Sequence, residues 1–114
     1  MGITEPDIAP DRFLDDVEMR VGEVVDVEPF PEARKPVCKL WVDLGEETLQ
    51  SAAGLTDLYD PADLIGSQVI CVCNLGSVSI AGFESECLVT GVDGDGGVVH
   101  LTTERQVEPG ERVY

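Results

Sequence analysis

The sequence has little positive charge: of its 114 residues only 7 are Lys or Arg, against 23 Asp or Glu, so the formal net charge is −16 at pH 7. This balance speaks against a general polyanion-binding surface, which needs a basic stripe. No apolar run approaches the ~20 residues of a transmembrane helix, and the N-terminus lacks the basic start and apolar core of a signal peptide. We therefore expect a cytoplasmic protein that binds no membrane.

Groups for catalysis or metal binding are also scarce. The four cysteines form no C-x-x-C pair, and His100 is the one histidine that could join them, so a zinc site is not predicted. The loop 93–97 departs from the EF-hand pattern, and no glycine-rich phosphate loop opens a helix. No nucleophile is marked beside His100. We predict a protein with no catalytic residue, no metal and no cofactor.

The acidic residues are spread over nearly the whole chain, in no block longer than a pair. An apolar fraction of 43% indicates a folded domain rather than disorder, so the charge belongs to a folded surface. A dense carboxylate shell stays hydrated in concentrated salt, which screens its self-repulsion. The hypothesis that follows is a protein of a halophilic organism.

Apolar and polar residues alternate with period two, which predicts a strand-rich domain. A short helix is delimited by Asp60 as N-cap, Pro61 at its first position and Gly66 beyond its end. One helical turn is expected at 11–16, after a flexible arm at 1–10. The predicted strands are 17–28 with a bend or bulge near Gly22, 38–44, 48–53, 68–74, 87–92 and 98–101. This order is typical of an all-β, five-stranded OB barrel with a helix between strands three and four, here a single domain over 11–114 with terminal extensions.

Three of the seven basic residues, Arg34, Lys35 and Lys39, fall within six positions beside Trp41. They could form a local basic lip on an RNA-binding face. Alternatively, they are solvated cations that pair with Glu32 and Asp43. The residues alone leave both interpretations open.

Three ordered motifs resemble the tRNA-binding domain family, namely MRVGEVV (19–25), FPEARKP followed by KLWVDLG (30–45), and NL with IAGFESE (74–86). This OB-fold module is appended to methionyl- and phenylalanyl-tRNA synthetases and also occurs alone, and the resemblance is closest to its CsaA type, an export-related chaperone. The resemblance implies a non-catalytic, tRNA-binding homodimer, built with the segments 13–17 and 107–114.

The resemblance also carries over individual positions. Together with the basic trio, it suggests an RNA-binding site composed of Arg34, Lys35, Lys39, Gln50, Ser51, Asn74, Ser85 and Glu86. Where the CsaA type has basic residues, this chain instead has Val78, Ser79 and Glu84. The alternative function is that of a chaperone for unfolded polypeptides, which would be held by Phe30, Trp41 and Phe83.

Overall fold

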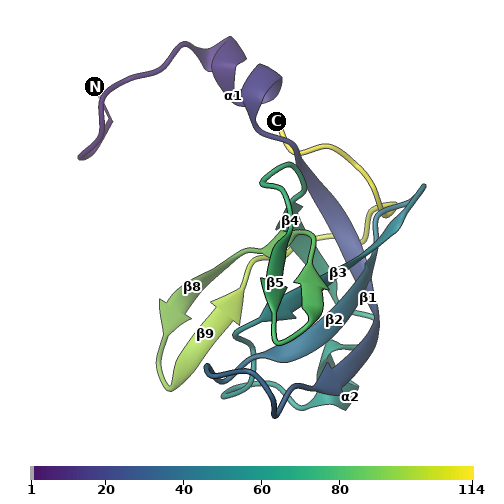
Figure 1. Cartoon of the computed structure of the whole chain (residues 1–114). Coiled ribbons are helices and arrows are strands. Elements are labelled where there is room, and N and C mark those ends of the chain that lie inside the picture. Colours follow the sequence, from purple (N-terminus) through teal and green to yellow (C-terminus); the bar gives the residue numbers. More distant parts are fainter. Residues whose placement is uncertain (1) are drawn as a thin grey trace.

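The computed structural model describes residues 2–114, which form a barrel of short antiparallel strands with two hairpins and two short helices (Figure 1). The helices are α1 (Pro10–Asp16) and α2 (Pro61–Leu64). The strands are β1 (Met19–Pro29), β2 (Cys38–Asp43), β3 (Thr48–Ala53), β4 (Gln68–Val72), β5 (Val78–Ile80), β6 (Phe83–Ser85), β7 (Leu88–Val89), β8 (Gly91–Gly94) and β9 (Gly97–His100).

Five strands, in the order β3-β2-β1-β4-β7, make one antiparallel sheet that curls into a nearly closed barrel. The pairs β5-β6 and β8-β9 form separate hairpins. The predicted five-stranded OB-type barrel is therefore confirmed, with the helix between the third and fourth strands. No helix within residues 2–114 is long and apolar enough to cross a membrane.

The irregularity predicted near Gly22 of β1 lies a little further along the strand. The register between β1 and β2 shifts between Val24 and Asp26, so the bulge lies beyond Gly22. At Gly22 the constraint is close packing, because a Cβ built there would lie 2.3 Å from Cγ1 of Val42. Glycine at this position therefore lets β1 cross closely over the side chains of β2.

The barrel core is built from alternate residues of β1 and β2 and from the whole of β4. Every residue of β4 is buried, as its continuous apolar run predicts. Three cysteines belong to this core: Cys38, Cys71 and Cys87 are buried, and none of the four is in a disulfide. Burial raises the pKa of the half-buried Cys73 to about 11, so its thiol is protonated at neutral pH.

The helix α2 seals one end of the barrel with Leu64, which is 1% exposed. It begins and ends as predicted. The Asp63 carboxylate accepts a hydrogen bond from the backbone N–H of Asp60 at 3.4 Å, and Gly66 follows the last turn with φ of +87°.

The strand predicted at 87–92 is divided in two. β7 pairs with β4 inside the barrel, whereas β8 leaves it and pairs with β9. Thr90, between the two strands, donates both its N–H and its hydroxyl to the carbonyl of Ile70. The alternating pattern continues across this junction, so the sequence does not reveal that the chain changes partner there.

The C-terminal segment lies along the first part of β1, ahead of the residues of β1 that pair with β2. The N–H of Val113 donates to the carbonyl of Met19, and Val21 exchanges backbone hydrogen bonds with Gly110 and Glu111. Arg112 donates to the carbonyls of Leu14 and Val17, so this segment is fastened to its own chain. The helix α1 begins at Pro10, one residue before the predicted turn, and stands away from the barrel (Figure 1). The flexibility predicted for the arm 1–10 stays a prediction, and Met1 lies outside the described residues.

Replacing Gly22 by alanine tests the close packing of β1 on β2. The new methyl group would meet Val42 at 2.3 Å and Leu44 at 3.0 Å, so we expect G22A to lower the free energy of unfolding by about 1–3 kcal/mol. The matched control is G54A, because a Cβ at Gly54 meets no atom within 4 Å. Chemical denaturation in molar KCl measures both variants. Equal stability of G22A and G54A would contradict this packing argument.

Candidate nucleic-acid interface

The hairpin β5-β6 folds over the outer side of the barrel next to β3 (Figure 1). Its turn consists of Ala81 and Gly82, which have φ of +46° and +83°. Positive φ at both turn residues is the type I′ pattern, whose twist matches that of two tightly connected antiparallel strands. Ile80 and Phe83 are paired directly across this turn, so their side chains lie on the same face of the hairpin.

An aromatic cluster joins the hairpin to the barrel. The ring of Phe83 packs edge-on against Phe30 and Trp41, at centroid distances of 5.5 and 5.9 Å. The ammonium group of Lys39 lies 4.7 Å from the centroid of Phe30 and 5.2 Å from that of Phe83. Phe30 and Phe83 are only 5% and 9% exposed, whereas Trp41 is half-buried. The two phenylalanines therefore hold the hairpin in place and present almost no surface to a peptide.

A seam of hydrogen bonds closes the barrel between β3 and the chain from β6 to Cys87. Gln50 and Ala52 are two residues apart on β3, so their N–H groups point to the same open edge. Oε1 of Glu86 accepts from the N–H of Gln50 at 3.0 Å, and Oγ of Ser85 accepts from the N–H of Ala52 at 3.0 Å. The N–H of Glu86 donates back to the carbonyl of Gln50 at 2.8 Å. Side-chain oxygens thus take the place that backbone carbonyls of a neighbouring strand would have in a regular sheet.

Two further bonds strengthen this seam. The hydroxyl of the buried Ser51 donates to the carbonyl of Cys87 at 2.7 Å, and Nε2 of Gln50 donates to the carbonyl of Glu84 at 2.8 Å. The structure therefore brings four predicted RNA-binding residues together, Gln50, Ser51, Ser85 and Glu86. It also engages the side chain of each of them in holding the barrel closed.

Asn74 lies apart from these four residues and joins other elements. Its Oδ1 accepts from the N–H of Glu18, and its Nδ2 donates to the carbonyl of Asp16, both at 2.9 Å. These two bonds fasten the end of α1 and the start of β1 to the chain that follows β4. The amide of Asn74 is thus satisfied within the described chain, although the residue is exposed.

The seven cations fall into two groups. Arg12, Arg20 and Arg105 each form a salt bridge, and Arg112 is held by two backbone carbonyls. By contrast, Arg34, Lys35 and Lys39 form no salt bridge with any residue of 2–114, so the pairing with Glu32 and Asp43 is not observed. Arg34 and Lys35 lie on the loop 30–37, and Lys39 lies on β2, where its ammonium group is over the rings of Phe30 and Phe83.

The positions that lack the expected basic residues lie on the same hairpin. Ser79 is paired with Glu84 across β5-β6, and both are exposed. Val78 is 61% exposed. This hairpin carries a carboxylate and no cation, so positive charge on this side of the molecule comes from the loop 30–37 and β2.

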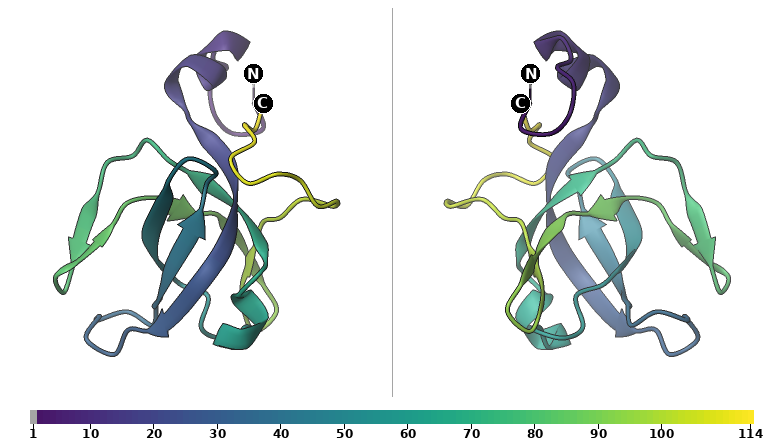
Figure 2. Two further views of the ribbon diagram at one scale, coloured as in Figure 1. Left: turned by 90° about the vertical axis from the view of Figure 1, so that its right-hand side faces the viewer. Right: turned by 90° about the vertical axis from the view of Figure 1, so that its left-hand side faces the viewer.

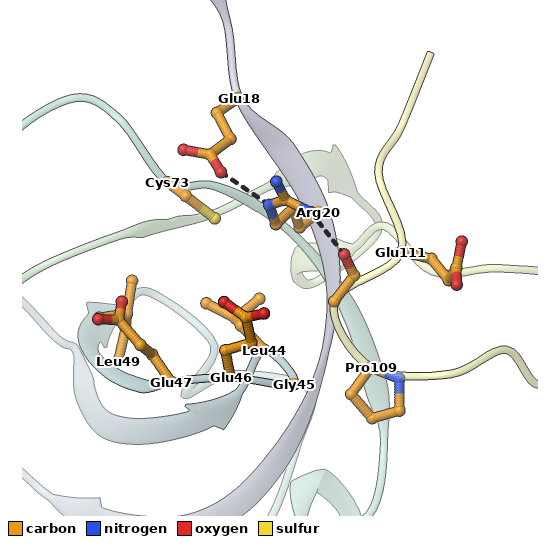
Figure 3. A pocket seen from close by; sticks show the side chains of 11 residues that line it. Glu18, Arg20, Leu44, Gly45, Glu46, Glu47, Leu49, Cys73, Pro109 and Glu111 are labelled. Carbon is orange, nitrogen blue, oxygen red and sulfur yellow. Dashed lines mark hydrogen bonds and ion pairs between the residues drawn. The ribbon is translucent and has the colours of Figure 1, made fainter.

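A pocket of about 430 Å³ lies between the start of β1, the β2-β3 turn and the C-terminal segment (Figure 3). Arg20 is its one cation, donating to Glu18 at 2.7 Å and to the carbonyl of Gly110 at 2.8 Å. The hydrogen bond to Glu18 raises the pKa of Arg20. The remaining charged residues that line this pocket are Glu46, Glu47 and Glu111. Because carboxylates surround a cation that is already paired, this pocket repels a phosphate backbone.

A groove of about 460 Å³ between the loop 30–37 and the tip of β5-β6 is a feature that the sequence analysis missed. Its apolar lining includes Val37 and Ile80, neither of which was predicted to be a site residue. The signal for the hairpin was present, since Ala81-Gly82 separates two short alternating segments. The side on which the hairpin folds follows only from its contacts with Phe30 and Gln50.

Removing the Ser85 hydroxyl tests whether the seam stabilises the fold. In S85A the N–H of Ala52 loses its acceptor in a half-buried position, so we expect the free energy of unfolding to fall by about 1–2 kcal/mol. S79A is the matched control on the same hairpin, because Ser79 is exposed and its hydroxyl has no partner within residues 2–114. Denaturation curves compare the two. An unchanged stability of S85A would show that the seam bond contributes nothing.

Comparison with known proteins identifies the family. Residues 19–112 match the family model of the tRNA binding domain. The methionine–tRNA ligase of Methanocaldococcus jannaschii is 38% identical over 102 residues, and that of Bacillus subtilis is 34% identical over 108 residues. These stretches cover 89% and 95% of this chain, which spans only 16% of the length of either ligase.

Solved structures agree with this result. Chaperone CsaA from Bacillus anthracis is 37% identical with a TM-score of 0.84, and the alignment covers 95% of this chain and all of the other. The CsaA chaperone protein from Picrophilus torridus is 33% identical with a TM-score of 0.86, covering 94% and 100%. The MetRS-related protein from Pyrococcus horikoshii is 30% identical with a TM-score of 0.83, covering 96% and 100%. With the motif resemblance, the barrel and the family match all in agreement, the chain belongs to the tRNA-binding domain family.

Proposed function

We propose that this chain is a non-catalytic module that binds tRNA in the cytoplasm through its cationic face, defined as the loop 30–37, Lys39 of β2 and the adjoining β5-β6 hairpin. The observation that carries the proposal is the distribution of the cations. The three that form no salt bridge within residues 2–114, Arg34, Lys35 and Lys39, lie on this face of a protein whose net charge is −16. Family membership supports tRNA as the ligand.

Few phosphate contacts are expected, because only three cations serve the face. Affinity from phosphate neutralisation falls steeply as salt rises, so a protein working in concentrated salt gains little from additional lysines. Hydrogen bonds and stacking then carry more of the binding energy. None of the 23 carboxylates is buried along residues 2–114, which supports the hypothesis of a surface adapted to high salt.

Chaperone activity on unfolded polypeptides is the second candidate, supported by the similarity to CsaA proteins. The predicted peptide-binding residues support it weakly, because Phe30 and Phe83 are buried and only Trp41 is half-exposed. For this reason we place tRNA binding first and treat peptide binding as the competing outcome.

We also propose that the protein is a homodimer that uses α1. This helix of seven residues contains no buried side chain, and Leu14 is 44% exposed. An isolated helix of this length is marginal in water, so a helix standing away from the barrel needs a partner surface. A second copy would bury Leu14, as the resemblance suggested for 13–17.

Single-charge variants test the cationic face. In R34Q we expect weaker tRNA binding at every salt concentration, and a slope of log affinity against log salt that is smaller by about one charge. The matched control is R105Q, which removes the same charge from an exposed residue of the C-terminal segment. Titration of fluorescent tRNA in a series of KCl concentrations measures both. If R34Q and R105Q have the same effect, binding does not use this face.

The wild-type titration also decides between the two functions, when it is repeated with an unfolded polypeptide. We expect tRNA to bind, since the face offers three cations that form no salt bridge within residues 2–114. Absence of tRNA binding at every salt concentration, with saturable binding of the polypeptide, would replace tRNA binding by the chaperone function.

An acidic substitution on α1 tests the dimer. We expect L14D to shift the protein from dimer to monomer, because the buried contact would acquire a charge. I65D is the control, since Ile65 is 49% exposed at the end of α2, remote from α1 (Figure 1). Light scattering after size exclusion distinguishes a chain of 12.3 kDa from its dimer. A wild-type monomer at micromolar concentration would contradict the proposal.

A further inference from the structure

The ammonium group of Lys39 lies over two rings that come from different projections of the barrel. Buried and half-buried residues alternate along β2, so the side chain of Lys39 points out of the barrel. Figure 2 shows the loop 30–37 and the hairpin β5-β6 projecting on the same side of the barrel, opposite the segment 101–110. Phe30 begins the loop and Phe83 begins β6, and the ammonium group is 4.7 and 5.2 Å from their ring centroids.

This placement is notable because a carboxylate is available to Lys39. Glu28 is exposed and lies directly opposite Lys39 across the pair β1-β2, where an opposite charge is the usual partner. On β3 the residue opposite Lys39 is Ala52, which carries no charge. No salt bridge joins Lys39 to Glu28 or to any other residue of 2–114. The ammonium group therefore lies over the rings although a carboxylate is close by.

One cation over two rings attracts both of them. The face of an aromatic ring is negative, and its attraction for a cation grows when water is excluded. Here the exclusion is substantial, because Phe30 and Phe83 are 5% and 9% exposed and Lys39 is half-buried. Salt screens partly buried charges much less than exposed ones. The contact therefore joins the hairpin to the loop in concentrated salt as well.

The position of Phe30 in turn determines where the loop presents its cations. The loop turns through the hydrogen bond from the N–H of Ala33 to the carbonyl of Phe30, at 3.3 Å. Arg34 and Lys35 follow this turn directly, and both are exposed. Moving the ammonium group of Lys39 to a phosphate would give up its contacts with both rings, whereas Arg34 and Lys35 give up no ring contact or salt bridge within 2–114.

We propose that Lys39 is a positioning residue, whose ammonium group holds the hairpin β5-β6 against the loop 30–37 and contacts no phosphate when tRNA binds. Arg34 and Lys35 make the phosphate contacts, and Lys39 acts through the geometry of the loop that carries them. The inference rests on the proposed function, and it divides the cations of the cationic face into two that meet the ligand and one that positions them.

Two lysine variants that remove the same charge separate positioning from phosphate contact. We expect K39Q to weaken tRNA binding by about fivefold at every KCl concentration, with the wild-type slope of log affinity against log salt. K35Q should decrease that slope by about one charge. K39R keeps a cation over the rings and should restore most of the affinity. A slope in K39Q that is reduced as in K35Q, or wild-type affinity in K39Q, would overturn the proposal.

The emission of Trp41 reports the position of the hairpin without any RNA. Trp41 is the one tryptophan of the chain, and its ring packs edge-on against Phe83 at a centroid distance of 5.9 Å. In K39Q we expect emission at longer wavelength and stronger quenching by acrylamide, because the hairpin leaves the barrel more often. K35Q and K39R should keep the wild-type emission. An unchanged emission in K39Q would overturn the proposal.

A measurement on the wild-type protein avoids dependence on the folding of K39Q. Lys35 and Lys39 are the two lysines of the chain, so selective ¹³C-lysine labelling gives one reference signal and one test signal. We expect ring currents to shift the ε-methylene protons of Lys39 upfield. After addition of tRNA this shift should remain, while the Lys35 signal moves. An unshifted Lys39 signal in the free protein, or loss of the shift with tRNA, would overturn the proposal.

Failure of the positioning role is distinguishable from failure of the proposed function. If the wild-type protein binds tRNA and K39Q matches K35Q in its salt slope, only the positioning role fails. If the wild-type protein binds no tRNA at any KCl concentration, the proposed function fails and the positioning role fails with it.

Discussion

Closure of the barrel between β3 and the chain that includes Ser85 and Glu86, at the end of β6, is the constraint on which the rest of the structure depends. The five-stranded sheet ends at β3, whose N–H groups at Gln50 and Ala52 need acceptors. Glu86 and Ser85 supply them through their side chains. The same contacts determine where the β5-β6 hairpin lies, and the hairpin then covers the aromatic cluster of Phe30 and Phe83. Barrel closure and the geometry of the candidate site are therefore one arrangement.

This arrangement gives the polar motif residues a structural role. Gln50, Ser51, Ser85 and Glu86 were predicted as RNA contacts because they are polar and fall on the motifs of the family. In the structure each has a hydrogen-bond partner within the barrel or its seam. If they influence RNA binding, they do so while holding the hairpin that forms one wall of the groove. Arg34 and Lys35, in contrast, have no partner in 2–114 and are free to meet a ligand.

Electrostatics reconciles a net charge of −16 with a family that binds tRNA. The charge that matters to a ligand is local, since screening limits interactions between exposed charges to about 8 Å at physiological salt and about 3 Å at 1 M. In the acidic pocket, the salt bridge with Glu18 neutralises the charge of Arg20 (Figure 3). The cationic face lies elsewhere, and its three cations form no salt bridge within residues 2–114.

The sequence by itself determined the barrel, because alternation of apolar residues marks each half-buried strand. It also determined the bounds of α2, through the N-cap Asp60, Pro61 at the first helical position and Gly66 beyond the end. It also located the basic trio, since those residues are close along the chain. Only the tertiary structure decided where the bulge falls in β1, where the strand at 87–92 divides, and which polar side chains are already occupied. These features depend on partners distant in sequence, such as Gln50 and Glu86, and local patterns do not encode which distant residue supplies the partner.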